Sequence, residues 1–203
     1  MATLCRQLFF ALFTCLTLSS CFSPSVQTAA SPGNRDVNIL SWSPGDSFRK
    51  IKQEIRDARL RPIKYSARAF ILVAPVLKDI YEAQRSLVEF DGKRRLTTLN
   101  VRVLPEPGSS GSDILRLYND VKDSLIGKLG PPTWELQSGQ AGRPEDILIA
   151  LSNGDLLRSV QWEGSRNIRM GIPPRVDGEV AIEILITKHP IRRSTTFWGG
   201  KPF

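Results

Sequence analysis

Few residues of this 203-residue chain have side chains that could do chemistry. Its one histidine, His189, precedes Pro190 near the C-terminus, and a single imidazole cannot form a histidine metal cage or a histidine relay. The polar run Gly108-Ser109-Ser110-Gly111 lacks the Gly-x-Ser-x-Gly pattern of a serine-hydrolase elbow. The chain also has no P-loop, no Gly-x-Gly-x-x-Gly and no paired-cysteine motif. The sequence therefore predicts no catalytic site, no metal site and no cofactor.

Glycoside hydrolysis is the one reaction for which the chain offers candidate groups, because it needs two acids that flank a scissile bond. Glu145, Asp146 and Glu163 are the nearest candidates. Adjacent residues of a strand point to opposite faces, so Glu145 and Asp146 are more simply interpreted as solvated residues at a sheet edge. A carboxylate-type hydrolase acting on cell-wall glycan stays open as an alternative function.

The three cysteines all lie within the first 21 residues, at positions 5, 15 and 21. Residues 1–20 carry one charge and a run of about eleven mainly apolar residues, which is typical of a secretory signal peptide and too short for a permanent spanning helix. The motif Leu18-Ser19-Ser20-Cys21 resembles the lipobox of bacterial lipoproteins. That resemblance implies cleavage between Ser20 and Cys21, and attachment of diacylglyceryl and palmitate-type acyl chains to Cys21.

The lipoprotein interpretation has consequences for the mature chain. Cys21 would be its only cysteine and would carry lipid, so we expect neither a disulfide nor a thiol nucleophile. Phe22 rather than Asp follows the cysteine, which among Gram-negative lipoproteins is usual for the outer membrane, and we expect an anchored envelope protein facing the periplasm. The Ser-, Pro- and Ala-rich residues 21–45 predict a lipidated tether with a reach of roughly 25–30 Å. Cleavage of an ordinary signal peptide at Ala29-Ala30 is the alternative.

The basic residues are concentrated in one segment. The chain has 28 Lys and Arg against 20 Asp and Glu, a net charge of +8, and residues 46–68 alone hold eight basic side chains against three acidic ones. We interpret the basic side chains of an expected helix as a candidate contact for an anionic surface such as lipopolysaccharide or peptidoglycan, with a solvated helix face as the alternative. Export removes nucleic acid as a partner. These candidates are Arg49, Lys50, Lys52, Arg56 and Arg59.

Three further features are interpreted as a partner contact, as packing residues or as a charged edge. The terminal segment 189–203 carries Phe197 and Trp198, which we interpret either as a tail docked on its own domain or as a contact for an envelope protein. Trp134 and Trp162 lie on expected strands and are assigned to sheet packing. The cluster Lys93-Arg94-Arg95 follows an expected hairpin turn and is interpreted as a charged edge that blocks strand pairing.

The elements that must position these residues can be read from hydrophobic periodicity and turn signals. Asp91-Gly92 predicts a tight hairpin, since this dipeptide tolerates the positive φ values of a two-residue turn, and Asn153-Gly154 predicts another. The second helix is expected to be capped by Ser112 and to end at Gly130. The full expectation is a helix at 46–60, a strand at 63–76, a hairpin at 86–90 and 95–103, a helix at 112–129, strands at 133–137, 146–151, 156–162 and 180–187, and a short edge piece at 167–172.

This order of elements predicts a single α+β domain over residues 46–188, an antiparallel sheet with two main helices packed on one face. The helix-then-strands order occurs twice and raises the hypothesis of a tandem helix-plus-hairpin repeat. It resembles the small envelope lipoproteins of the BamE-like and β-lactamase-inhibitor-protein-like group, from which no binding residue is carried over. We expect a non-catalytic binding or assembly module; a structural lipoprotein that binds lipopolysaccharide or peptidoglycan is a further alternative, and the oligomeric state is left open.

Overall fold

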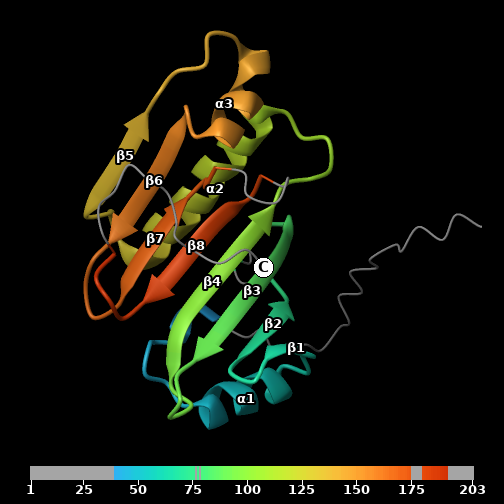
Figure 1. Ribbon diagram of the computed structural model, residues 1–203, viewed down its shortest axis with the longest axis vertical. Helices are drawn as coiled ribbons and strands as arrows, with labels where there is room; N and C mark the ends of the chain where they lie inside the picture. The colour runs from blue at the N-terminus through green and yellow to red at the C-terminus, as the bar shows by residue number, and fades with distance from the viewer. Residues whose placement is uncertain (1–38, 76, 78, 175–179, 192–203) are drawn as a thin grey trace, which may run out of the picture. The chain divides into compact units, whose positions relative to one another are not determined.

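The structure is a computed structural model, and it describes residues 39–75, 77, 79–174 and 180–191 (Figure 1). The expected signal peptide, Ser20 and Cys21, and the terminal Phe197 and Trp198, lie outside the described residues. No helix in the described part of the chain is both long enough and apolar enough to cross a membrane.

An eight-stranded antiparallel sheet forms the domain, with strand order β1-β2-β3-β4-β8-β7-β6-β5. This is the expected α+β class. The elements are η1 (Ile39–Ser41), α1 (Phe48–Asp57), β1 (Ile63–Ser66), β2 (Ala69–Val73), β3 (Ala83–Phe90), β4 (Leu96–Leu104), α2 (Gly111–Leu129), β5 (Trp134–Ser138), η2 (Pro144–Asp146), α3 (Ile147–Asn153), β6 (Leu157–Trp162), β7 (Asn167–Gly171) and β8 (Ile182–Thr187).

The order helix, then four strands, occurs twice along the chain (Figure 1). Each half forms a four-stranded meander, and the two meanders meet through the pairing of their last strands, β4 and β8. The buried residues of α1 and α2 join one core cluster with alternate residues of the central strands, such as Leu99 on β4 and Ile186 on β8. Both main helices therefore cover the same face of the sheet, as expected.

The first helix has one of the expected N-caps but ends at Asp57 rather than at residue 60, and the folded domain begins earlier than expected. Ser47 caps α1, because its Oγ accepts a hydrogen bond from the Lys50 amide (3.2 Å), and Ile51 and Ile55 face the core. Trp42 ahead of the helix is fully buried, so the tether boundary placed at residue 45 is too late. The sequence pattern hid this boundary because Trp42 is an isolated apolar residue among Ser, Pro and Gly.

The second helix is confirmed, but its N-cap is Ser110 rather than Ser112. The Ser110 hydroxyl accepts from the Asp113 amide (3.2 Å), and the Asp113 carboxylate accepts from the Ser110 amide (3.1 Å), so the two residues form a capping box. Ile114, Tyr118, Val121 and Leu125 are buried on one face of α2, and Gly130 ends the helix with a φ of 80°.

The strand expected at 146–151 is wrong, since these residues form the end of η2 and most of α3. Asn153-Gly154 is consequently not a hairpin turn: Gly154 has a φ of 80° and caps α3 by donating its amide to the carbonyls of Ala150 and Leu151. A short apolar run has no periodicity that separates a strand from a buried helix, and here packing on α2 decides for the helix.

Three smaller expectations are also corrected. The stretch 63–76 is two strands, β1 and β2, joined at residues 67–68. The piece at 167–172 is β7, an interior strand rather than an edge. The hairpin of β3 and β4 is confirmed, but its positive φ falls at Arg94 (57°) and not at Gly92, because the turn is longer than two residues.

Candidate functional site

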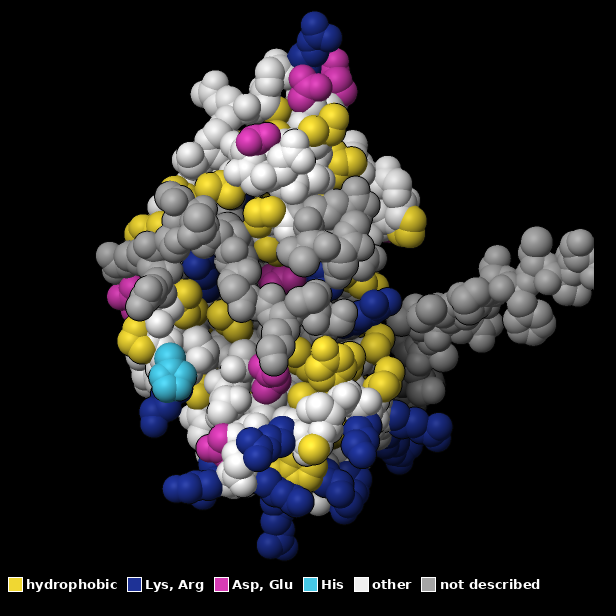
Figure 2. Space-filling view, viewed as in Figure 1, with side chains coloured by type: hydrophobic (Ala, Val, Ile, Leu, Met, Phe, Trp, Pro, Cys, Tyr) yellow, Lys and Arg dark blue, Asp and Glu magenta, His cyan; other side chains and the backbone are white. Residues whose placement is uncertain are grey.

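The structure gathers two basic segments that lie apart in the sequence at one end of the sheet. We call residues 46–68 and 91–95 together the basic end; they hold eleven basic side chains against four acidic ones, a net charge of +7. Residues from 21 onward that lie outside the basic end have no net charge. Figure 2 shows Lys and Arg side chains crowded at the end of the sheet that carries α1, with few acidic ones among them.

Backbone hydrogen bonds hold the start of α1 against the turn between β3 and β4. The Phe48 amide donates to the Arg94 carbonyl (2.9 Å), and the Gly45 amide donates to the Leu96 carbonyl (2.7 Å). Ser47 and Arg95 form an isolated antiparallel bridge beside these bonds. The positions of the two basic segments relative to each other are therefore fixed by main-chain contacts rather than by side chains that repel each other.

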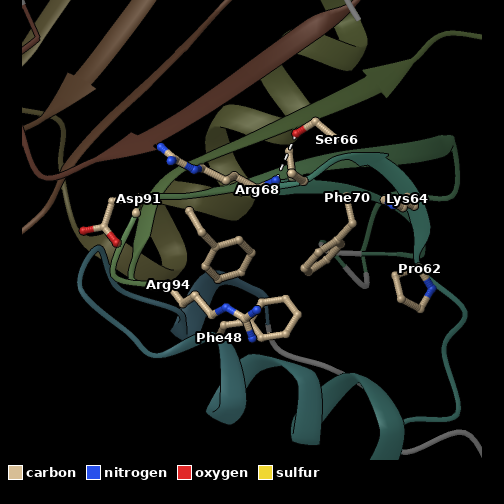
Figure 3. Close-up of a pocket in the computed structure, with 12 residues that line it drawn as sticks. Phe48, Pro62, Lys64, Ser66, Arg68, Phe70, Asp91 and Arg94 are labelled. Carbon is tan, nitrogen blue, oxygen red and sulfur yellow. Dashed lines mark hydrogen bonds between the residues drawn. The ribbon is translucent and has the colours of Figure 1, made fainter.

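A pocket with an aromatic floor opens at the basic end (Figure 3). Its volume is about 460 Å³, and its floor consists of Phe48 from α1, Phe70 from β2 and Phe90 from β3. The Phe48 ring lies edge-on to Phe90 with centroids 5.0 Å apart and edge-on to Phe70 at 6.5 Å. These contacts are the preferred geometry for aromatic pairs and connect the floor to the hydrophobic core.

Three exposed cations, Lys64, Arg68 and Arg94, also line the pocket. The Arg94 guanidinium lies 5.7 Å from the Phe48 ring centroid, and Figure 3 shows it beside that ring. Arg68 reaches from the β1–β2 turn toward the β3–β4 turn, where a Cβ placed on Gly92 would lie 3.8 Å from its Nη2. Within the described part of the chain, none of the three cations forms an ion pair.

Asp91 is the one acidic residue among the described residues that line this pocket. Its Oδ1 accepts hydrogen bonds from the amides of Lys93 (2.8 Å) and Arg95 (2.9 Å) and so closes the β3–β4 turn. Because the Asp91 carboxylate accepts backbone hydrogen bonds and pairs with none of the three cations, Lys64, Arg68 and Arg94 are available to a ligand.

The basic residues singled out from the sequence lie on or next to α1, and all five are exposed. Lys50 pairs with Asp46 (3.0 Å), and Lys52 lies 6.0 Å from the Phe48 centroid. Partial burial opposes ionisation of Asp46, but hydrogen bonds from the Ser43 amide and from Lys50 outweigh it and lower its pKa. None of the five is among the residues that line the pocket; they are Arg49, Lys50, Lys52, Arg56 and Arg59.

The candidate carboxylates do not line the aromatic pocket. Glu145 and Asp146 are exposed in η2, and Glu163 is exposed after β6. His189 is exposed beyond β8, with its backbone amide donating to the Thr187 hydroxyl (3.3 Å). Over the described residues, no three His, Cys, Asp or Glu side chains gather into a group that could hold a metal ion.

The two strand tryptophans lie in the sheet as expected. Trp162 is buried and donates its Nε1–H to the Gly130 carbonyl (2.8 Å), which ties β6 to the end of α2. Trp134 is half-buried on the edge strand β5, with the Arg169 guanidinium 5.9 Å from its ring centroid. Both are packing residues of the sheet.

Comparison of the chain with family models, with curated proteins and with solved structures found no match.

The pocket residues escaped sequence reasoning because the three phenylalanines are separated by up to 42 positions. The available signal was local: Phe90 directly precedes the turn that carries Arg94, and Phe48 opens the basic helix. Only the pairing of β2 with β3 and the docking of α1 bring the rings together.

Proposed function

We propose that this chain is a lipid-anchored protein of the cell envelope whose folded domain is a non-catalytic binding module. Cys21 carries the lipid, the anchor holds the protein in the outer membrane facing the periplasm, and the basic end binds an anionic envelope surface such as the phosphates of lipid headgroups. The observation that carries this proposal is the concentration of net charge, +7, at one end of the sheet.

The physical basis is electrostatic attraction supported by the anchor. Each Lys or Arg near an anionic membrane surface contributes roughly 1 kcal/mol at physiological salt. A lipid anchor keeps the domain close to such surfaces, so a modest attraction is enough for stable contact. The aromatic pocket lies at the same end. Its apolar surface can contribute to binding in addition to the attraction between charges.

Capture of vesicles tests this binding. The full chain is reconstituted in phosphatidylcholine vesicles, which are then mixed with dye-labelled vesicles containing phosphatidylglycerol. We expect capture at about 0.1 M salt and loss of capture near 1 M, because the Debye length falls from about 10 Å to about 3 Å. Equal capture of purely zwitterionic labelled vesicles, or capture that ignores salt, contradicts the proposal.

The anchor is tested separately through the cysteine itself. Cys21→Ser should leave an unlipidated precursor that keeps residues 1–20, whereas Cys15→Ser, inside the signal segment, should leave lipidation intact. Mass spectrometry of membrane fractions measures both outcomes. A wild-type protein whose mass includes no acyl chains contradicts the lipobox interpretation.

A second candidate function, assembly with an envelope protein, is favoured by the exposed edge strand β1. Ile63 and Tyr65 on this strand are 57% and 47% exposed, and β1 pairs with β2 on one side only. Such an edge can accept an added strand from a partner. In-cell crosslinking from position 65 followed by mass spectrometry should recover one envelope protein in near-equal amount; recovery of no protein discards this candidate.

A further inference from the structure

The two halves of the domain differ at equivalent places. In each half, the helix begins at the end of the sheet where the first and second strands of its meander are connected (Figure 1). In the second half, that connection runs from β5 to β6 and contains α3, which packs on the first residue of α2. A Cβ on Gly111 would lie 2.5 Å from the Leu148 amide nitrogen, so α3 packs directly against the start of α2.

The first half has no such filler. Its connection between β1 and β2 consists of residues 67–68 alone, and the space beside the start of α1 is the pocket above Phe48, Phe70 and Phe90. In the first half, an aromatic-lined pocket therefore lies beside the start of the helix, where the second half has the packed helix α3. Apolar surface left open in this way is typical of a ligand site.

We propose that this pocket binds a single phosphorylated amphiphile, with the apolar chain on the phenylalanine floor and the phosphate at the rim that carries Lys64, Arg68 and Arg94. This goes beyond the proposed function, since attraction to a surface depends on the summed charge of the basic end, whereas the pocket recognises one molecule. A volume of about 460 Å³ lies within the usual range of ligand sites.

The chemistry of the lining selects this ligand class. Phe70 and Phe90 are 8% and 6% exposed at the floor, where a polar head would lose its hydration without gaining partners. The cations are exposed at the rim, where an anion keeps part of its water. Arginine forms paired hydrogen bonds to phosphate, and three cations with no described ion-pair partner match a doubly charged head better than a carboxylate.

The probe is decyl phosphate carrying a photoreactive diazirine on its chain, added to the full chain in phosphatidylcholine vesicles. Crosslinked peptides are mapped by mass spectrometry. We expect the label on peptides that contain Phe48, Phe70 or Phe90, with competition by unlabelled decyl phosphate. Equal competition by inorganic phosphate shows a simple anion site, and equal competition by decyl maltoside shows an unselective apolar surface; either result overturns the proposal.

Adjacent residues of the β3–β4 turn supply a matched pair of variants. Arg94 lines the pocket and Lys93 does not, while both are exposed and both changes to Gln remove one charge. Arg94→Gln should lower labelling about tenfold, because a charge-assisted contact contributes about 1.5 kcal/mol or more, and Lys93→Gln should leave labelling within about twofold. Equal loss in both variants contradicts a pocket site.

The same pair separates this proposal from the proposed function. Capture of anionic vesicles should fall to a similar extent in both variants, because it depends on the summed charge of the basic end, to which Lys93 and Arg94 contribute equally. Labelling without vesicle capture contradicts only the surface-binding proposal, and vesicle capture without labelling contradicts only the pocket. If Arg94→Gln unfolds, which circular dichroism would show, Arg68→Gln replaces it with the same expected loss.

Discussion

Tyr118 on α2 is a buried residue whose hydroxyl has no hydrogen-bond partner among the described residues. A buried hydroxyl without a partner costs free energy, so Tyr118→Phe should raise the free energy of unfolding by about 0.5–1 kcal/mol. Urea denaturation measures the change, with the exposed Tyr65→Phe as a control that should have little effect. A loss above about 1 kcal/mol in Tyr118→Phe would show that the hydroxyl is bonded after all.

Tyr118 also predicts a pH dependence. Burial raises the pKa of its phenol far above the ordinary value of 10, with nearby Glu135 adding to the shift. The folded state therefore favours the neutral phenol, and its contribution to stability is complete below pH 10 and falls as the pH rises above it. Wild type should lose stability more steeply than Tyr118→Phe between about pH 10 and pH 11. Parallel curves in thermal denaturation contradict this.

At the residue scale, the sequence indicated the basic helix but not the pocket. Charge is visible in one dimension, and Arg49, Lys52 and Arg56 could be named without a structure. The position of Phe70 depends on strand pairing. The position of Arg94 depends on a turn that is longer than the two-residue turn predicted from Asp91-Gly92. Side chains brought together by long-range pairing are the part that sequence reasoning cannot reach.

At the element scale, the docking of α3 on α2 depends on Gly111. Gly111→Ala introduces a methyl group 2.5 Å from the Leu148 nitrogen and should destabilise the domain by about 1–3 kcal/mol. Gly127→Ala in the same helix meets nothing within 4 Å and should stabilise by about 0.5–1 kcal/mol. Denaturation of both variants tests this, and the same sign for both changes rules out the packing described.

The ion pair of Lys122 and Glu135 joins α2 to β5 at 2.8 Å. Hydrogen bonds from Lys122 and then Gln137 lower the pKa of Glu135, so the pair stabilises the fold above the ordinary glutamate pKa and is lost as the pH falls through the lowered one. Lys122→Met should cost about 0.5 kcal/mol at pH 7 and progressively less below about pH 4.5. An undiminished difference at pH 3, measured by urea denaturation, would refute the electrostatic origin.

Elements with strong local signals were predicted correctly. The amphipathic period and the Gly130-Pro131 stop defined α2, and the turn signal Asp91-Gly92 located the β3–β4 hairpin. The strand predicted at 146–151 was wrong because six residues are too few to show a period. The helix found there packs on Gly111, which is distant in sequence.

At the scale of the whole molecule, the sequence indicated that the order of elements occurs twice. It did not indicate how the two halves join. Pairing β4 with β8 joins residues more than 80 positions apart, such as Val101 with Ile184, and no local pattern specifies it. That pairing makes one continuous sheet with its helices on one face and places the basic end opposite the end filled by α3 (Figure 1). The concentration of positive charge at one end of the sheet, together with the aromatic pocket at that end, is what supports a binding role.

The central claim is that the basic end, rather than total charge, binds the anionic surface. The most direct test compares vesicle capture by Arg49→Gln/Lys52→Gln/Arg56→Gln with capture by a control that removes three cations elsewhere, Arg116→Gln/Lys128→Gln/Arg143→Gln. The first variant should lose about 3 kcal/mol, more than about a hundredfold, and the control should stay within about threefold of wild type. Equal loss in both variants, or no loss in the first, would contradict the account.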